Sequence, residues 1–204
     1  MTPRSDEDLL RAFVGGDPTA FELLVRRHAA AVYQFVARFT KNAASTEDVV
    51  QETFLQISQS AAAFDGKRLF RPWLYTIAAN KARDALRAST RRREFVSDFR
   101  DDPDEARACY QDLLRVDVES PAAELETDEK RRAVRKIVDA MPRPLWEVLV
   151  LAYYHQFRYR QIAAILDMPL GTVKSRLHAA VAFLGREYRA LRTTETPVAD
   201  EDAG

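Results

Sequence analysis

The fold of this chain is decided by residues 159–184, which read YRQIAAILDMPLGTVKSRLHAAVAFL. Apolar residues recur at helical spacing in both halves of the stretch. Asp167 and Met168 interrupt the pattern, and Pro169 suits the first turn of a new helix because its missing N–H would have no partner there. The stretch therefore predicts two helices joined by a tight turn. The expected buried residues are Ile162, Ala163, Ile165 and Leu166 in the first helix, and Val173, Leu177, Ala180, Val181 and Leu184 in the second.

The second helix carries its polar residues largely on the side opposite this apolar stripe. They are Thr172, Lys174, Ser175, Arg176 and His178. A short helix, a turn and a second helix with a donor-rich face is the helix-turn-helix design, in which the second helix enters the major groove of DNA. Any amphipathic helical hairpin with a solvated basic face has the same pattern, so the residues alone leave both interpretations open.

Two more helices are expected before this motif, one ending at Met141 and one over 145–154 that is entered through Pro144. The expected buried residues of the first are Leu125, Ala133, Val134, Ile137 and Val138. Arg158, Tyr159 and Arg160 then stand at the entrance to the motif, where side chains commonly contact phosphates.

Charge is segregated along the chain, although 31 Lys and Arg balance 31 Asp and Glu overall. Residues 66–93 contain nine Lys or Arg and one acidic residue, residues 94–130 contain four and thirteen, and residues 131–193 contain twelve and four. Two basic blocks that flank an acidic one indicate separate basic surfaces for a polyanion, joined by a segment that avoids it.

Composition excludes several classes of protein. With 204 residues and 47% hydrophobic residues the chain can form one domain or two small ones. The single Cys109 and three scattered histidines offer neither a disulfide framework nor a metal-ligand cluster, and no nucleophile–base arrangement or phosphate-cradling loop is visible. No signal peptide or run of roughly 18 apolar residues is present. We therefore expect a cytoplasmic protein that is not an enzyme, binds no metal or cofactor and does not insert into a membrane.

The N-terminal third is expected to form three helices. The first runs from a Ser5 cap to Val14, and the second follows Asp17-Pro18 and continues to about Thr40. His28, in the second, is expected to be a surface or packing residue. A third helix is expected from a cap at Ser45 to about Ala63, with Asp48, Gln51 and Glu52 sharing one face.

Aromatic and basic residues alternate after the turn signal at Asp65-Gly66. Phe64 and Phe70, interleaved with Lys67, Arg68 and Arg71, can combine base stacking with phosphate neutralisation. A helix that starts near Pro72 and runs to about Ser89 follows, with Trp73, Leu74 and Ile77 assigned to the core. Arg83 and Arg87 place like charges side by side, which is unfavourable unless an anion lies across them.

Two segments, TEDVVQETFL at residues 46–55 and GTVKSRL at residues 171–177, together resemble one family, the extracytoplasmic-function sigma factors of bacterial RNA polymerase. TEDVVQETFL at residues 46–55 is similar, nearly residue for residue, to the segment with which this family holds the polymerase clamp helices. GTVKSRL at residues 171–177, preceded by Ile162-Ala163, is similar to the family's promoter-reading C-terminal domain. The resemblance covers roughly residues 6–90 and 122–190.

The resemblance implies three sets of contacts. Core polymerase would be bound by Asp48, Gln51, Glu52 and Leu55. The minus-ten element would be bound by Phe64, Lys67, Arg68, Phe70, Arg71, Asn80, Arg83 and Arg87, with the loop before the helix trapping an unstacked base. The minus-thirty-five element would be bound by Arg158, Tyr159, Thr172, Lys174, Ser175, Arg176 and His178.

Four positions depart from the family pattern. Thr46 replaces a common Ala, and Asp167 replaces a common turn Gly, which is tolerable because Asp visits the left-handed region readily. Gln161 replaces the usual Glu, a mild change. Ala179 stands where the family usually has Arg, which removes one cationic contact.

The sequence thus predicts an all-α protein of two small helical domains joined by an acidic linker. The expected parts are an N-terminal domain (1–93), a linker (94–121), a helix-turn-helix domain (122–192) and a disordered tail (193–204). The expected function is a sigma factor with core RNA polymerase, promoter DNA and an anti-sigma factor as partners. The alternatives are a helix-turn-helix regulator that is not a polymerase subunit and a helical interaction module that binds no DNA.

Overall fold

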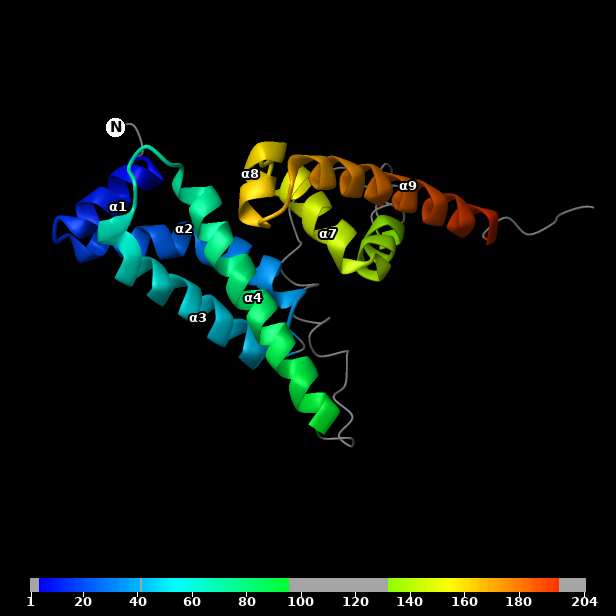
Figure 1. Ribbon diagram of the computed structural model, residues 1–204, viewed down its shortest axis with the longest axis horizontal. Coiled ribbons are helices and arrows are strands. Elements are labelled where there is room, and N and C mark those ends of the chain that lie inside the picture. Colours follow the sequence, from blue (N-terminus) through cyan, green and yellow to red (C-terminus); the bar gives the residue numbers. More distant parts are fainter. Residues whose placement is uncertain (1–3, 41, 96–131, 195–204) are drawn as a thin grey trace, which may run out of the picture. The chain divides into compact units, whose positions relative to one another are not determined.

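The computed structural model describes residues 4–40, 42–95 and 132–194, and within them it contains helices and no strand. The chain divides into two compact units, one built mainly from the N-terminal helices and the other mainly from the C-terminal helices. Figure 1 shows the two groups of helices. The predicted all-α, two-domain fold is therefore confirmed. The acidic linker and the tail beyond Thr194 lie outside the described residues.

The N-terminal unit consists of four α-helices and a short 3-10 turn. They are α1 (Asp6–Val14), α2 (Pro18–Ala37), α3 (Ala43–Ser60), η1 (Ala61–Ala63) and α4 (Phe70–Phe95). The first two start where the sequence predicts, because Ser5 Oγ accepts from the Asp8 N–H at 3.1 Å and Asp17 Oδ1 accepts from the Thr19 N–H at 3.1 Å. Gly16 adopts a φ of 100°, which a side chain would strain, so the chain reverses tightly between α1 and α2.

The start of α3 differs from the prediction. Its cap is Asn42, whose Oδ1 accepts from the Ser45 N–H at 2.8 Å, so that Ser45 lies inside the first turn. Thr46 is buried, and its hydroxyl donates to the Asn42 carbonyl oxygen at 3.0 Å. Asn and Ser are both favourable helix caps, and in α3 the earlier residue, Asn42, is the cap instead of Ser45.

The core of this unit lies where α2, α3 and α4 pack against one another and α1 covers α2. Its fully buried side chains include Leu24, Phe35, Ile57 and Leu74. Tyr75 lies edge-on to Phe35 with ring centroids 5.4 Å apart. Burial of a large apolar side chain contributes roughly 1.5–3 kcal/mol, so this core holds α3 and α4 in fixed register for the surfaces they carry.

The C-terminal unit contains a helical stretch over 132–140, then α7 (Arg143–Leu149), η2 (Val150–Tyr154), α8 (Tyr159–Ile165) and α9 (Leu170–Thr194). The predicted helix over 145–154 is present, but its last turn, η2, is a π-helix. Val173, Leu177 and Ala180 are buried, as expected. The prediction of burial is wrong for two residues, because Val134 is 41% exposed and Val181 is 48% exposed.

The turn between α8 and α9 has the conformation that the sequence predicts. Asp167 adopts a φ of 49°, in the left-handed region that Gly, Asn and Asp tolerate best. The Met168 N–H donates to the Ala163 carbonyl oxygen at 3.0 Å, and the Val173 N–H to that of Pro169 at 3.2 Å. These bonds close one helix and open the next, which fixes the helix-turn-helix geometry.

Candidate functional site

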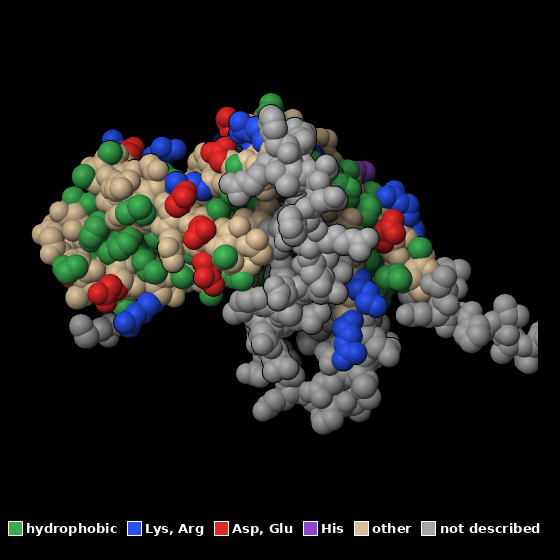
Figure 2. All heavy atoms as spheres, turned by 90° about the horizontal axis from the view of Figure 1, so that it is seen from below, with side chains coloured by type: hydrophobic (Ala, Val, Ile, Leu, Met, Phe, Trp, Pro, Cys, Tyr) green, Lys and Arg blue, Asp and Glu red, His purple; other side chains and the backbone are tan. Residues whose placement is uncertain are grey.

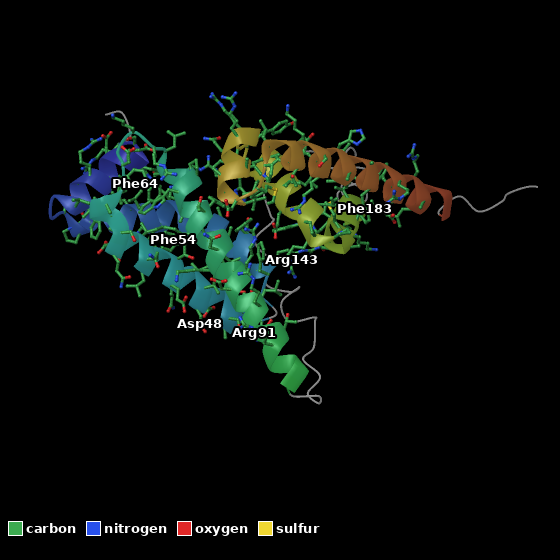
Figure 3. The ribbon with its side chains drawn as sticks, viewed as in Figure 1. Asp48, Phe54, Phe64, Arg91, Arg143 and Phe183 are labelled. Atoms are coloured by element: carbon green, nitrogen blue, oxygen red, sulfur yellow. The ribbon has the colours of Figure 1, made fainter. Side chains whose placement is uncertain are left out.

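The outward face of α3 presents the four residues that the sequence assigns to polymerase binding. Asp48, Gln51, Glu52 and Leu55 are all exposed, Leu55 at 57%. Their spacing of three and four residues places them on one side of the helix. Figure 3 shows Asp48 on the outer side of α3 and Phe54 on the side turned toward the other helices. Figure 2 shows acidic side chains gathered on the face of this unit that is seen there.

One member of this face is tied to the neighbouring helix. Lys81 Nζ of α4 lies 3.2 Å from Glu52 Oε2, with the two side chains 24% and 61% exposed. The pair therefore holds the Glu52 carboxylate beside α4 while leaving most of it accessible. Sequence reasoning missed Lys81, because its partner is 29 residues away and only the packing of α3 on α4 brings them together.

The loop between η1 and α4 is a compact turn. Asp65 Oδ1 accepts from the Lys67 N–H at 3.0 Å, and the Asp65 carbonyl oxygen accepts from the Arg68 N–H at 2.9 Å. An aspartate that bonds the backbone two residues on is a common way of building such a turn. Lys67, Arg68 and Leu69 are exposed as a result, Leu69 at 58%. The turn thus presents two cations and an apolar side chain together.

Phe70 does not lie at the surface that the sequence predicts for it. The pattern indicates a ring for base stacking, but the Phe70 side chain is 0% exposed and its ring packs against His28, with centroids 5.5 Å apart. The aromatic rings at this surface are those of Phe64 and Trp73, which are half-buried with centroids 4.7 Å apart. Trp73, expected in the core, is therefore at its edge, whereas Leu74 is buried as expected.

The outer side of α4 continues this surface. Arg71, Asn80 and Arg87 are exposed, and Arg83 is half-buried. Arg87 lies 2.9 Å from Asp84 Oδ1 in an i, i+3 pair. The like charges of Arg83 and Arg87 are thus offset by a carboxylate of the same helix, so their spacing does not by itself demand an external anion.

The helix-turn-helix has a basic hollow at its entrance. An open hollow of about 500 Å³ is lined by Arg158, Tyr159, Arg160, Gln161, Leu170 and Lys174. Three of these side chains are cationic and none is acidic. Gln161 Oε1 accepts from the Arg158 N–H at 2.8 Å, which caps α8 from within its first turn. Gln161 and Leu170 were not predicted, because only the folded turn brings the two helix starts together.

The polar residues of α9 divide into two groups. Lys174, Ser175 and His178 are exposed, whereas Thr172 and Arg176 are half-buried. The Ser175 hydroxyl donates to the Thr172 carbonyl oxygen at 3.1 Å, and an Arg176 guanidinium nitrogen lies 3.8 Å from Met168 Sδ. Ala179 is exposed as well, so no packing constraint accounts for the absence of a longer side chain there.

A partly buried group of hydrogen-bonded side chains holds α1 against α2. His28 Nε2 lies 2.8 Å from Asp6 Oδ2, and an Arg27 guanidinium nitrogen lies 3.0 Å from Asp6 Oδ1. The hydrogen bond from His28, reinforced by Arg27 against the opposing effect of burial, lowers the pKa of the Asp6 carboxyl. His28 is thus a packing residue, as predicted. Among the described residues no cluster of metal-ligating side chains occurs, and no helix is long and apolar enough to cross a membrane.

Comparison with known proteins assigns both units. Residues 24–92 match the family model of sigma-70 region 2, and residues 131–184 match that of sigma-70 region 4. The RNA polymerase sigma-H factor of Pseudomonas aeruginosa is 31% identical over 180 residues, which cover 88% of this chain and 92% of that protein. The ECF RNA polymerase sigma-E factor of Escherichia coli (strain K12) is 33% identical over 176 residues, covering 86% and 90%.

Two solved structures are also similar. CnrH, in complex with the cytosolic domain of CnrY, has a TM-score of 0.62 and 26% identity and covers 95% of this chain and 100% of that one. The sigma factor RpoE of Bartonella quintana, in complex with the anti-sigma factor NepR, has a TM-score of 0.58 and 22% identity, covering 83% and 96%. The second likeness concerns the fold alone.

Proposed function

Because this chain belongs to the extracytoplasmic-function sigma factors and so directs promoter-specific initiation by RNA polymerase, we propose a role for each of its three surfaces. The outward face of α3 binds core polymerase. The 64–69 loop and α4 bind the minus-ten element, and the α8–α9 motif binds the minus-thirty-five element. The observation that carries the function is the presence of region 2 and region 4, in this order, in one chain.

The proposal for α3 rests on its exposed, mixed face. Charged groups at the rim of an interface steer and orient a partner, while an exposed Leu55 supplies apolar area between them. The polymerase surface that fits it is basic with an apolar depression. Lys81, which holds Glu52 in place, then acts as a positioning residue for this contact.

The proposal for the minus-ten surface replaces Phe70 by Trp73. Phe64 and Trp73 form a half-exposed aromatic pair beside the cations Lys67 and Arg68. Stacking of an unpaired base on an aromatic ring is worth roughly 1–3 kcal/mol, and the neighbouring cations neutralise phosphates. This combination favours a single strand over a duplex, and therefore stabilises an opened promoter.

The proposal for the α8–α9 motif separates two kinds of contact. The hollow of Arg158, Arg160 and Lys174 suits a backbone phosphate, which fixes the register of the motif on the duplex. Ser175 and His178 on the exposed side of α9 are placed for base edges in the major groove, and Lys174, which lines the hollow from the same helix, can reach either a phosphate or a base edge. Arg176 is half-buried and its guanidinium lies against Met168 in the turn, so it extends less far toward DNA than the exposed residues of α9.

The protein itself catalyses no reaction in this proposal and acts in the cytoplasm, where polymerase works. Its proposed parts are an N-terminal domain (1–93), a linker (94–121) and a helix-turn-helix domain (122–192). An anti-sigma protein is a further proposed partner. The deciding experiment mixes the full chain with core polymerase and maps transcription start sites. A stable complex and new start sites are expected. A regulator that is not a polymerase subunit would instead bind DNA without joining the core enzyme.

A further inference from the structure

We propose that Glu7 of α1 is a positioning residue for promoter opening, because it fixes the start of α4 and with it the 64–69 loop. Its Oε1 accepts a hydrogen bond from the Phe70 N–H at 2.8 Å, across 63 residues of sequence. This functional role rests on the minus-ten surface proposed above. Helix α1 lies before residue 24, where the region 2 match begins, so that match assigns it nothing.

The bond between Glu7 and the Phe70 N–H lies at the first residue of α4. The first N–H groups of a helix have no partner within the helix, and a carboxylate there also interacts favourably with the helix dipole. A hydrogen bond to an ionised acceptor is stronger than a neutral one. Glu7 therefore supplies the cap of α4 from another helix, and the loop residues before Phe70 are left to turn outward.

Helix α1 contacts both ends of the loop. It packs against η1, which precedes the loop, and against α4, which follows it. Figure 1 shows α1 beside the connection from α3 to α4. With both flanks held by one helix, the exposed segment between them spans a fixed gap, which limits the conformations of Phe64, Lys67 and Arg68.

Helix α1 is itself held rigidly. Asp6 is bound by His28 and Arg27 of α2, and Leu9 and Leu10 are buried at 0% and 2% exposure. The His28 ring also packs on Phe70, so Asp6, His28 and Phe70 form one continuous contact from α1 through α2 to α4. Glu7 thus belongs to a helix that is anchored to α2, and its bond to the Phe70 N–H ties the end of the loop to that helix.

The chain offers a conservative variant and a matched control. Glu7→Gln keeps an acceptor for the Phe70 N–H but removes the charge, whereas Glu7→Ala removes both. Asp8→Asn is the control, because Asp8 is the next acidic residue of the same turn but bonds Ser5 and Arg11 within α1 instead of α4. A general weakening of α1 would affect the control as well.

The experiment measures two quantities in the full chain. Amide hydrogen exchange over residues 64–72 reports the positioning, and fluorescence of a base analogue in the minus-ten element, with core polymerase, reports opening. We expect Glu7→Ala to accelerate exchange and to lower the opened fraction at least fivefold at unchanged polymerase affinity. Glu7→Gln should recover most of the opening, and Asp8→Asn should match the wild type in both.

Each contrary result has a separate meaning. Unchanged exchange in Glu7→Ala overturns the positioning role. Faster exchange with wild-type opening, or an equal loss in Asp8→Asn, overturns its link to opening. A wild-type chain that binds core polymerase but opens no promoter overturns the minus-ten surface itself, and this functional inference falls with it.

Discussion

Reversing the charge of the α3 face should abolish polymerase binding at little expense of stability. The variant combines Asp48→Arg, Gln51→Ala and Glu52→Arg. All three residues are exposed, and surface substitutions usually change stability by less than about 0.5 kcal/mol. Glu52 adds the loss of its exposed pair with Lys81, worth about 0.2–1 kcal/mol. The expected total is at most about 2.5 kcal/mol, which leaves a folded protein.

Binding should respond far more strongly than folding. Like charges brought together at an interface oppose association by several kcal/mol. Two reversals that together oppose binding by about 4 kcal/mol weaken it about a thousandfold. Fluorescence anisotropy with labelled core polymerase gives the affinity, and urea unfolding followed by circular dichroism gives the stability.

The matched control is Glu22→Arg, which reverses one exposed charge on α2 instead of α3. The single variant Asp48→Arg should weaken binding, whereas Glu22→Arg should not. Equal effects of these two variants would mean that net charge, not the α3 face, governs the affinity. A folded triple variant that binds core polymerase like the wild type would refute the assignment.

Three other predictions concern DNA binding and acid stability. Lys174→Ala should weaken binding to a minus-thirty-five duplex by about 1–3 kcal/mol if Lys174 contacts a base. Arg87→Ala should leave the affinity for that duplex unchanged and reduce promoter opening. Equal losses of duplex affinity in the two variants would contradict the assignment of Lys174 and Arg87 to different promoter elements. Ala179→Arg should strengthen duplex binding and steepen the slope of log affinity against log salt concentration by about the amount that one added phosphate contact gives. An unchanged slope in this salt titration would place residue 179 away from DNA. Because the Asp6 pKa lies below its ordinary value of 3.8, its pairing stabilises the fold above that pH and ceases to do so as the pH falls through the lowered pKa. Asp6→Asn should therefore be less stable than the wild type near pH 6, with the difference shrinking below about pH 4 in urea titrations; a constant difference would contradict the linkage.

The helices and their outward faces could be predicted because they depend on local patterns. The spacing of Asp48, Gln51, Glu52 and Leu55 places them together in any regular helix, whatever packs behind it. The left-handed Asp167 follows in the same way from the turn between two amphipathic segments. Such features need no knowledge of the rest of the molecule.

What could not be predicted depends on partners far away in sequence. Phe70 looks like an exposed aromatic because it stands among cations, but its ring packs against His28 of α2 and its N–H donates to Glu7 of α1. Val181 continues an apolar stripe, but at 3.6 residues per turn it lies at the edge of that stripe, whose centre is marked by the buried Val173 and Ala180. The sequence pattern does not say how wide a face the neighbouring helices cover, so a residue at the edge of a stripe can be exposed.

Gln161 shows how a substitution can be mild for the fold and still matter for a surface. Glutamine and glutamate both offer an oxygen to the Arg158 N–H, so either closes the first turn of α8. Glutamate, however, would bring a negative charge into the hollow that Arg158, Arg160 and Lys174 line. In the phosphate contact proposed above, glutamine would leave the three cations their full attraction for the phosphate, and this would offset part of the cationic contact absent at Ala179.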